Sequence, residues 1–161
     1  EYNTPPHVVK HCIAVTDVAV RMGRALKNKG YSLDLNLIQG AALIHDIARV
    51  EDKHWEAGSN IAASLGYPQE AEIIQVNMHH ALSATLDDLT ETDIVCLADR
   101  MVLEDQYVGL DRRMDYVIEK AKAQGNADAE PHILRRKEAA KRLVREIERV
   151  IDVELDVLME G

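Results

Sequence analysis

The sequence predicts an all-α protein, a packed bundle of helices in one domain. The chain has 161 residues, which is enough for one domain to bury a core, and 47% of them are hydrophobic. Phe is absent, so Leu, Ile, Val, Ala and Met must fill that core, and this composition suits packed helices better than a β-sandwich. Apolar residues also recur at helical spacing in segment after segment.

The first two expected helices each carry titratable residues on an apolar face. The first follows Thr4-Pro5-Pro6, with Thr4 or a nearby residue as its cap, and stops at Gly30. His11 lies on its apolar stripe and therefore points inward. Asp34 caps the second, which carries His45-Asp46 near its C-terminal end. A carboxylate on an apolar helix is costly to bury unless a positive group lies against it.

The next two expected helices carry histidines. The third covers residues 54–65, and His54 at its start is either a functional residue or an N-terminal histidine beside a packing glycine. Pro68 opens the fourth, which reaches His79 and His80 at its far end. Spacing alone does not decide which of these two histidines faces the core.

The fifth expected helix contains an acid in an otherwise apolar segment. Residues 90–93 form a capping-box pattern, and the helix follows from Ile94 to about Glu104. Asp99 lies in its middle. The alternative to a functional role is a purely structural ion pair with Arg100 or Arg21.

The remaining sequence predicts two further helices. One runs from Asp111 to about Gln124 and ends at Gly125-Asn126. The other begins at Glu130-Pro131 and carries an apolar stripe as far as Leu158, opposite a charged face that we expect to be solvated.

Charge and composition exclude several classes of function. The net charge is −9, with 28 acidic against 19 basic residues, so no stable nucleic-acid binding is expected. No apolar run reaches the roughly 18 residues of a membrane span, and no signal peptide is recognisable. Cys12 and Cys96 lie in helical core patterns and form no motif, which favours a reduced, cytoplasmic setting. The first residue is not Met, as in a fragment, a trimmed chain or a processed form.

Taken together, the residues at or inside apolar helical runs predict a metal site. They are His11, His45, Asp46, His54, His79 or His80, and Asp99. Imidazole and carboxylate ligands suit Fe, Mn, Zn, Ni or Co better than Ca. No thiolate belongs to the set, so a closed structural zinc site is not expected.

At this point the chain resembles the HD superfamily of metal-dependent phosphohydrolases, whose pattern is a lone His, then His-Asp, then a distant Asp. The resemblance covers about residues 7–105 and implies a helical bundle with metal at its centre. It implies that His11, His45, Asp46 and Asp99 hold one metal, and that Asp46 bridges to a second held by His54 and His79. Residues 98–112 most resemble HD domains that follow a molybdenum-cofactor-type nucleotidyltransferase domain, which this chain lacks.

The resemblance implies a hydrolase for a nucleotide or another small phosphorylated metabolite, acting through metal-bound hydroxide on phosphorus. One or two divalent transition-metal ions are expected, first Fe or Mn, then Zn, Ni, Co or Mg. Asp46 and Lys53 are the expected catalytic residues, and Arg49, Lys53, Arg100 and Arg112 the expected phosphate-binding residues, each with ordinary surface charge as its alternative. The alternative functions are a dinuclear-iron oxygenase of the HD fold and a regulatory module without turnover. A homo-oligomer is compatible with the amphipathic last helix.

Overall fold

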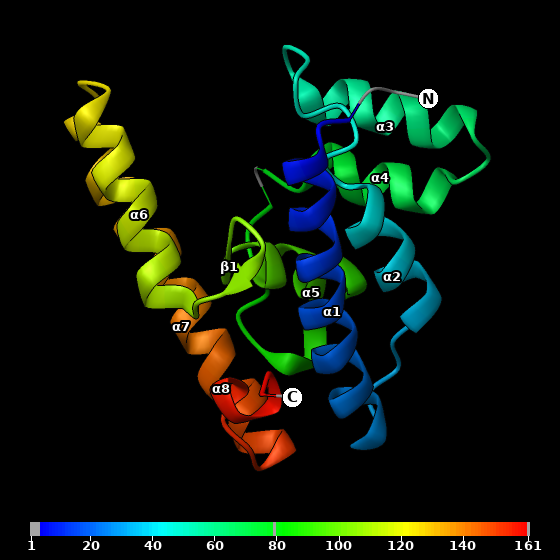
Figure 1. Ribbon diagram of the computed structural model, residues 1–161. Helices are drawn as coiled ribbons and strands as arrows, with labels where there is room; N and C mark the ends of the chain where they lie inside the picture. The colour runs from blue at the N-terminus through cyan, green and yellow to red at the C-terminus, as the bar shows by residue number, and fades with distance from the viewer. Residues whose placement is uncertain (1–3, 79, 161) are drawn as a thin grey trace.

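The computed structural model describes residues 4–78 and 80–160 and confirms the predicted all-α class (Figure 1). The α-helices and strands in chain order are α1 Pro6–Asn28, α2 Leu35–Ile44, α3 His54–Ser64, α4 Pro68–Val76, α5 Glu91–Asp99, β1 Val102–Leu103, β2 Gln106–Tyr107, α6 Leu110–Ala123, α7 Glu130–Ile151 and α8 Leu155–Leu158. Short 3₁₀ turns lie at Leu86–Asp88 and Ala127–Ala129. No helix in the described ranges has both the length and the apolar character that a membrane span requires.

Helix α1 lies in the middle of the bundle, with α2 and α5 packed on it and the α6–α7 pair on the other side (Figure 1). Its buried face includes Val15, Ala19 and Met22, each fully inaccessible to solvent. Gly23 allows the close approach of α2, because a Cβ at this position would lie 3.0 Å from side-chain atoms of Leu35 and Ile38. The main apolar core is continuous from α1, α2 and α5 into α6, α7 and α8. Burial of this shared surface holds the C-terminal helices on the bundle.

Helices α3 and α4 pack on each other beside this core and form a smaller cluster around Ala62, Ala71 and Ile74. This pair lies at the end of the bundle where α1 begins (Figure 1). The chain enters it through the segment that follows α2. The start of α3 is therefore held beside the end of α2.

The capping box predicted at the start of α5 is confirmed. Thr90 accepts from the backbone N–H of Asp93, and the Asp93 carboxylate accepts from the backbone N–H of Thr90. Asp93 is fully buried and also accepts from Ser83 and His80. Burial alone would raise the pKa of Asp93, but these hydrogen bonds outweigh it and lower the pKa. Of the two alternatives predicted for the cap of α1, Thr4 is wrong and a nearby residue is right: Pro5 holds the cap position without a side-chain hydrogen bond, and the Thr4 hydroxyl donates to the carbonyl of Ile47.

Two helices end earlier than the periodicity predicts. Helix α2 ends at Ile44, and His45-Asp46 begin a run of tight turns in which the backbone N–H groups of Ile47, Arg49 and Glu51 bond the carbonyl three residues back. Helix α4 ends at Val76, so His80 is not on it; its ring binds Asp93 instead. Local hydrogen bonds compete with the helix at both places, and apolar spacing does not record them.

The ends of α5 and α7 also differ from the ends that the periodicity predicts. Helix α5 ends at Asp99, and the next residues form the antiparallel pair β1–β2, with Val102 opposite Tyr107 and Glu104 at a positive φ of 56° in the turn. A short apolar run is buried as well in a strand as in a helix, so the pattern cannot distinguish them. Helix α7 ends where Asp152 adopts φ 58°, and the apolar stripe continues into the separate helix α8.

Candidate metal centre

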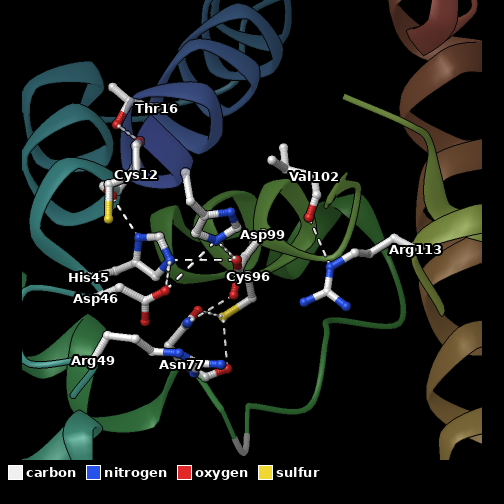
Figure 2. Close-up of polar contacts among 12 residues, drawn as sticks. Cys12, Thr16, His45, Asp46, Arg49, Asn77, Cys96, Asp99, Val102 and Arg113 are labelled. Carbon is white, nitrogen blue, oxygen red and sulfur yellow. Dashed lines mark hydrogen bonds and ion pairs between the residues drawn. The ribbon is translucent and has the colours of Figure 1, made fainter. Parts of the chain in front are cut away.

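Four of the predicted ligands meet in the centre of the fold, although they come from three separate segments (Figure 2). His11 lies on the second turn of α1, and Asp99 is the last residue of α5. His45 and Asp46 follow α2 directly, and the tight turns there direct both side chains inward. The meeting of these segments requires α1 to pack against both α2 and α5.

The Nε2 atoms of both histidines lie close to a carboxylate oxygen of Asp99 and to one of Asp46. The Nε2 atom of His11 is 2.9 Å from Oδ1 of Asp99 and 3.7 Å from Oδ2 of Asp46. The Nε2 atom of His45 is 3.5 Å from Oδ1 of Asp99 and 3.4 Å from Oδ2 of Asp46. Two imidazole nitrogens and two carboxylate oxygens thus surround one point.

Backbone carbonyls fix the orientation of both rings. Nδ1 of His11 lies 2.7 Å from the carbonyl oxygen of Glu104, and Nδ1 of His45 lies 2.6 Å from that of Ala42. A carbonyl oxygen can only accept, so each Nδ1 carries the proton and each Nε2 is directed at the shared point. Nε2 of His45 is buried and makes no hydrogen bond in the described structure. An orphaned imidazole nitrogen between two carboxylates fits a cation.

Charge is balanced inside the cluster. Burial alone would lower the pKa of His45, but the negative charges of Asp99 and Asp46 outweigh it and raise the pKa well above its usual range. Burial alone would raise the pKa of Asp99, and the charge of His45 with the hydrogen bond from His11 instead lowers it far below its usual range. The carboxylate of Asp99 therefore stays ionised and requires positive charge beside it.

Asp46 presents its second oxygen to a different histidine. Its Oδ1 atom is 3.9 Å from Nε2 of His54, the first residue of α3. Arg49 donates to that same Nε2 at 3.2 Å, so Nε2 of His54 carries no proton and its lone pair accepts from Arg49. Burial and then the charge of Arg49 lower the pKa of His54, which keeps this ring neutral at pH 7. His79, the other residue predicted beside a second ion, lies outside the described residues.

Asn77 is a contact residue that the sequence pattern did not reveal. Its amide nitrogen lies 3.4 Å from Oδ2 of Asp99, the oxygen that does not face the histidines. The thiol of Cys96 donates to the amide oxygen of Asn77 at 3.0 Å and so sets which way the amide points. Burial raises the pKa of Cys96 to about 12, so it remains a thiol. Cys12 is also close, within 4.8 Å of ligand atoms on His45 and Asp46.

A cavity of about 960 Å³ opens beside the cluster, between the bundle and the α6–α7 pair. Of the predicted phosphate-binding residues, Arg49 and Arg100 line it, whereas Lys53 and Arg112 are exposed and do not. Arg113 and Arg136 also line it. No sequence signal marked these two, because their helices read as ordinary amphipathic helices with a charged face.

The alternative ion pairs for Asp99 are not formed. Arg21 donates to Asp17 and to the carbonyl of Leu158. Arg100 donates to the carbonyl of His80. Burial and then the positive charge of Arg136 lower the pKa of Arg100 from its ordinary value. The negative charge of Asp99 is thus directed at the histidines.

Residues 8–102, more than half of the chain, match the HD domain family, and the match spans the whole cluster from His11 to Asp99. An uncharacterized protein of Methanocaldococcus jannaschii is 37% identical over 71 residues, which cover 42% of this chain and 42% of that protein. The aligned part is therefore less than half the length of this relative. No solved structure matches the chain.

Proposed function

Because the chain belongs to the HD domain family, which generally includes metal-dependent hydrolases, we propose that it is a metal-dependent phosphohydrolase. Its substrate is a small phosphorylated metabolite, and nucleotides are the first class to test. The observation that carries the proposal is the convergence of His11, His45, Asp46 and Asp99 on one point, with Nε2 of His45 buried and without a hydrogen bond. The likeness of residues 98–112 to HD domains that accompany nucleotidyltransferases rests on sequence alone, and we propose no partner domain from it.

In this proposal the four residues hold a divalent transition-metal ion, with Fe or Mn as the first choices. Asp46 and His54, together with His79, hold a second. The two oxygens of Asp46 already face different histidines, which is the arrangement that a bridging carboxylate needs. A divalent ion bound here supplies an acidified water and neutralises charge on phosphate oxygens.

The side chains around the cluster bind and orient the phosphate. Arg49 and Arg100 both line the cavity, one from the segment after α2 and one from the end of α5. Guanidinium groups bind phosphate oxygens with charge-assisted hydrogen bonds and hold the ester in one orientation. Lys53 and Arg112 do not line the cavity, so this proposal gives them no contact with the phosphate. Asn77 holds the outer oxygen of Asp99, which keeps the inner oxygen directed at the histidines.

The test begins with elemental analysis of protein purified without added metal or chelator. Close to two ions per chain supports the extended set with His54 and His79, and about one confines the site to the four central residues. A panel of phosphate monoesters, diesters and nucleotides is then assayed for phosphate release with and without oxygen. We expect oxygen-independent release that Asp46→Asn abolishes.

Asp17→Asn, which removes an exposed carboxylate on α1, is the matched control and should keep full activity. Consumption of oxygen without phosphate release would favour an oxygenase instead. The absence of bound metal, even after reconstitution, would refute the proposal.

A further inference from the structure

Arg100 and Arg136 both face the cavity and are anchored to the same short segment. Arg100 follows the last residue of α5 and donates to the carbonyl of His80 at 3.0 Å. Arg136 lies on α7 and donates to the carbonyl of Met78 at 3.1 Å. The two arginines come from distant parts of the sequence, yet their anchors are only two residues apart.

Neither arginine forms an ion pair within the described part of the chain, although both are partly buried. Among the described residues, each has one hydrogen-bond partner, a neutral carbonyl, so most of its five N–H donors make no contact within this part of the chain. Like charges held together in a partly desolvated place repel each other. This arrangement is unfavourable in the free protein and becomes favourable when an anion lies between the two groups.

Basic residues gather at the cavity although the chain as a whole is acidic, with a net charge of −9. The cavity nevertheless collects Arg49, Arg100, Arg113 and Arg136 on its walls. The acids on its walls outside the metal cluster are Glu104 and Asp105, both in the exposed turn between β1 and β2. The charge of the cavity is therefore opposite to the charge of the protein.

We propose that Arg100 and Arg136 form an oxyanion-binding site for a second anionic group of the substrate, with Arg100 shared between this site and the phosphate at the metal centre. The substrate class is then a molecule with two phosphoryl groups, or with a phosphoryl and a carboxyl group, an assignment that rests on the proposed hydrolase function. Arg136 lies outside the residues that match the HD domain family, so α7 supplies specificity that the family segment does not encode.

The cavity has the size and the lining for such a molecule. Its volume of about 960 Å³ is far larger than one phosphate needs and lies at the upper end for small-molecule sites. Met114 and Val117 on α6 and Ile133 on α7 give it an apolar wall. A substrate can therefore place one anionic group at the metal centre and another at the arginine pair, with its neutral body against this wall.

The first experiment measures oxyanion binding without any turnover. Sulfate is titrated into the full chain at constant ionic strength, with chloride as the balancing anion, and the unfolding temperature gives the apparent affinity. We expect Arg136→Gln to weaken sulfate binding about tenfold or more, since a charge-assisted pair is lost. Arg136→Lys should weaken it less, because the charge remains. Arg135→Gln, an exposed neighbour on α7 that does not line the cavity, is the matched control.

Unfolding in chloride alone shows whether each variant is folded. Equal sulfate affinity in Arg136→Gln and the unchanged chain would overturn the site. Loss of binding in Arg135→Gln as well would also overturn it, because the effect would then be one of general surface charge.

The second experiment tests whether the anionic group bound by the arginine pair is part of the substrate. We compare the unchanged chain with Arg136→Gln. The KM is measured for p-nitrophenyl phosphate, which has one phosphoryl group, and for ethylene glycol bisphosphate, which has two. We expect Arg136→Gln to raise the KM of the bisphosphate about tenfold more than that of the monophosphate, and sulfate to compete with the bisphosphate. Equal effects on the two compounds, with sulfate acting non-competitively, would refute the substrate assignment. If neither is hydrolysed while sulfate binding still requires Arg136, the proposed function fails and the oxyanion site stands.

Discussion

The carboxylate of Asp99 is the most informative group to change, because Asp99→Asn keeps the shape of the side chain and removes its charge. Its Oδ1 lies 2.9 Å from Nε2 of His11 and 3.5 Å from Nε2 of His45, and its Oδ2 lies 3.4 Å from the amide of Asn77. A hydrogen bond to a charged group contributes about 1.5–3 kcal/mol. The metal-free variant should be destabilised by this amount. At about 2–4 °C per kcal/mol for a chain of this size, the unfolding temperature falls by about 3–12 °C.

The same substitution should affect bound metal far more strongly. Loss of an outer partner lowers metal affinity about 10–100-fold, and loss of a direct ligand should exceed that. Metal content is measured on protein purified without added metal, and unfolding temperature is measured with and without chelator. We expect chelator to lower the unfolding temperature of the unchanged chain and to leave that of Asp99→Asn where it was. Asp105→Asn, an exposed carboxylate on the same cavity, controls for charge. Unchanged metal content in Asp99→Asn would refute the assignment of this residue.

Three further predictions concern the fold around the site. Since the folded-state pKa of Asp93 is lowered, its charge stabilises the protein above the unfolded pKa of about 3.9, and this contribution is lost as pH falls through the folded pKa. Urea unfolding should therefore show a stability gap between Asp93→Asn and the unchanged chain at about pH 7 that narrows by about pH 3; a constant gap would contradict this. Leu143→Ala on α7, at a position 1% exposed, should cost about 2–5 kcal/mol, whereas Leu134→Ala, at a position 42% exposed, should change stability by less than about 0.5 kcal/mol. Equal effects would mean that α7 does not share the core. Because burial raises the pKa of Cys96 to about 12, iodoacetamide at about pH 8 should not modify it in the folded chain, as mass spectrometry can check; rapid modification would show that the thiol is accessible.

The helices were predictable where a cap or a breaker coincides with a long apolar stripe. The capping box of Thr90 and Asp93, the proline at the start of α4 and the glycine after α6 each mark a real boundary. Where a helix ends for a tertiary reason, no local sequence pattern predicts its end. Helix α5 stops at Asp99 because the following residues turn back as β1–β2, and this turn brings the carbonyl of Glu104 to His11.

The central part of the site was predictable because each of its residues breaks an apolar pattern. A histidine or aspartate among buried apolar residues requires a partner, so the positions of His11, His45 and Asp99 on apolar runs indicated that they meet. Asn77 and Arg136 break no such pattern. Asn77 follows the end of α4, and only its contacts with Asp99 and Cys96 reveal that it faces the site. Arg136 lies on a charged helix face, and only the packing of α7 reveals that it lines the cavity.

The end of α5 joins the two halves of the site. Asp99 faces His11 and His45, and Arg100, the next residue, lines the cavity and donates to the carbonyl of His80. The carbonyl of Met101 accepts from two N–H groups just before α6, and Arg113 on α6 donates to the carbonyl of Val102. These bonds fix the α6–α7 pair relative to the cluster. A continuous helix to Glu104, as the periodicity predicts, would remove the β1–β2 pair and with it the contact between the carbonyl of Glu104 and His11. The early end of α5 therefore lets the chain turn back, so that α6 and α7 pack beside the proposed metal centre.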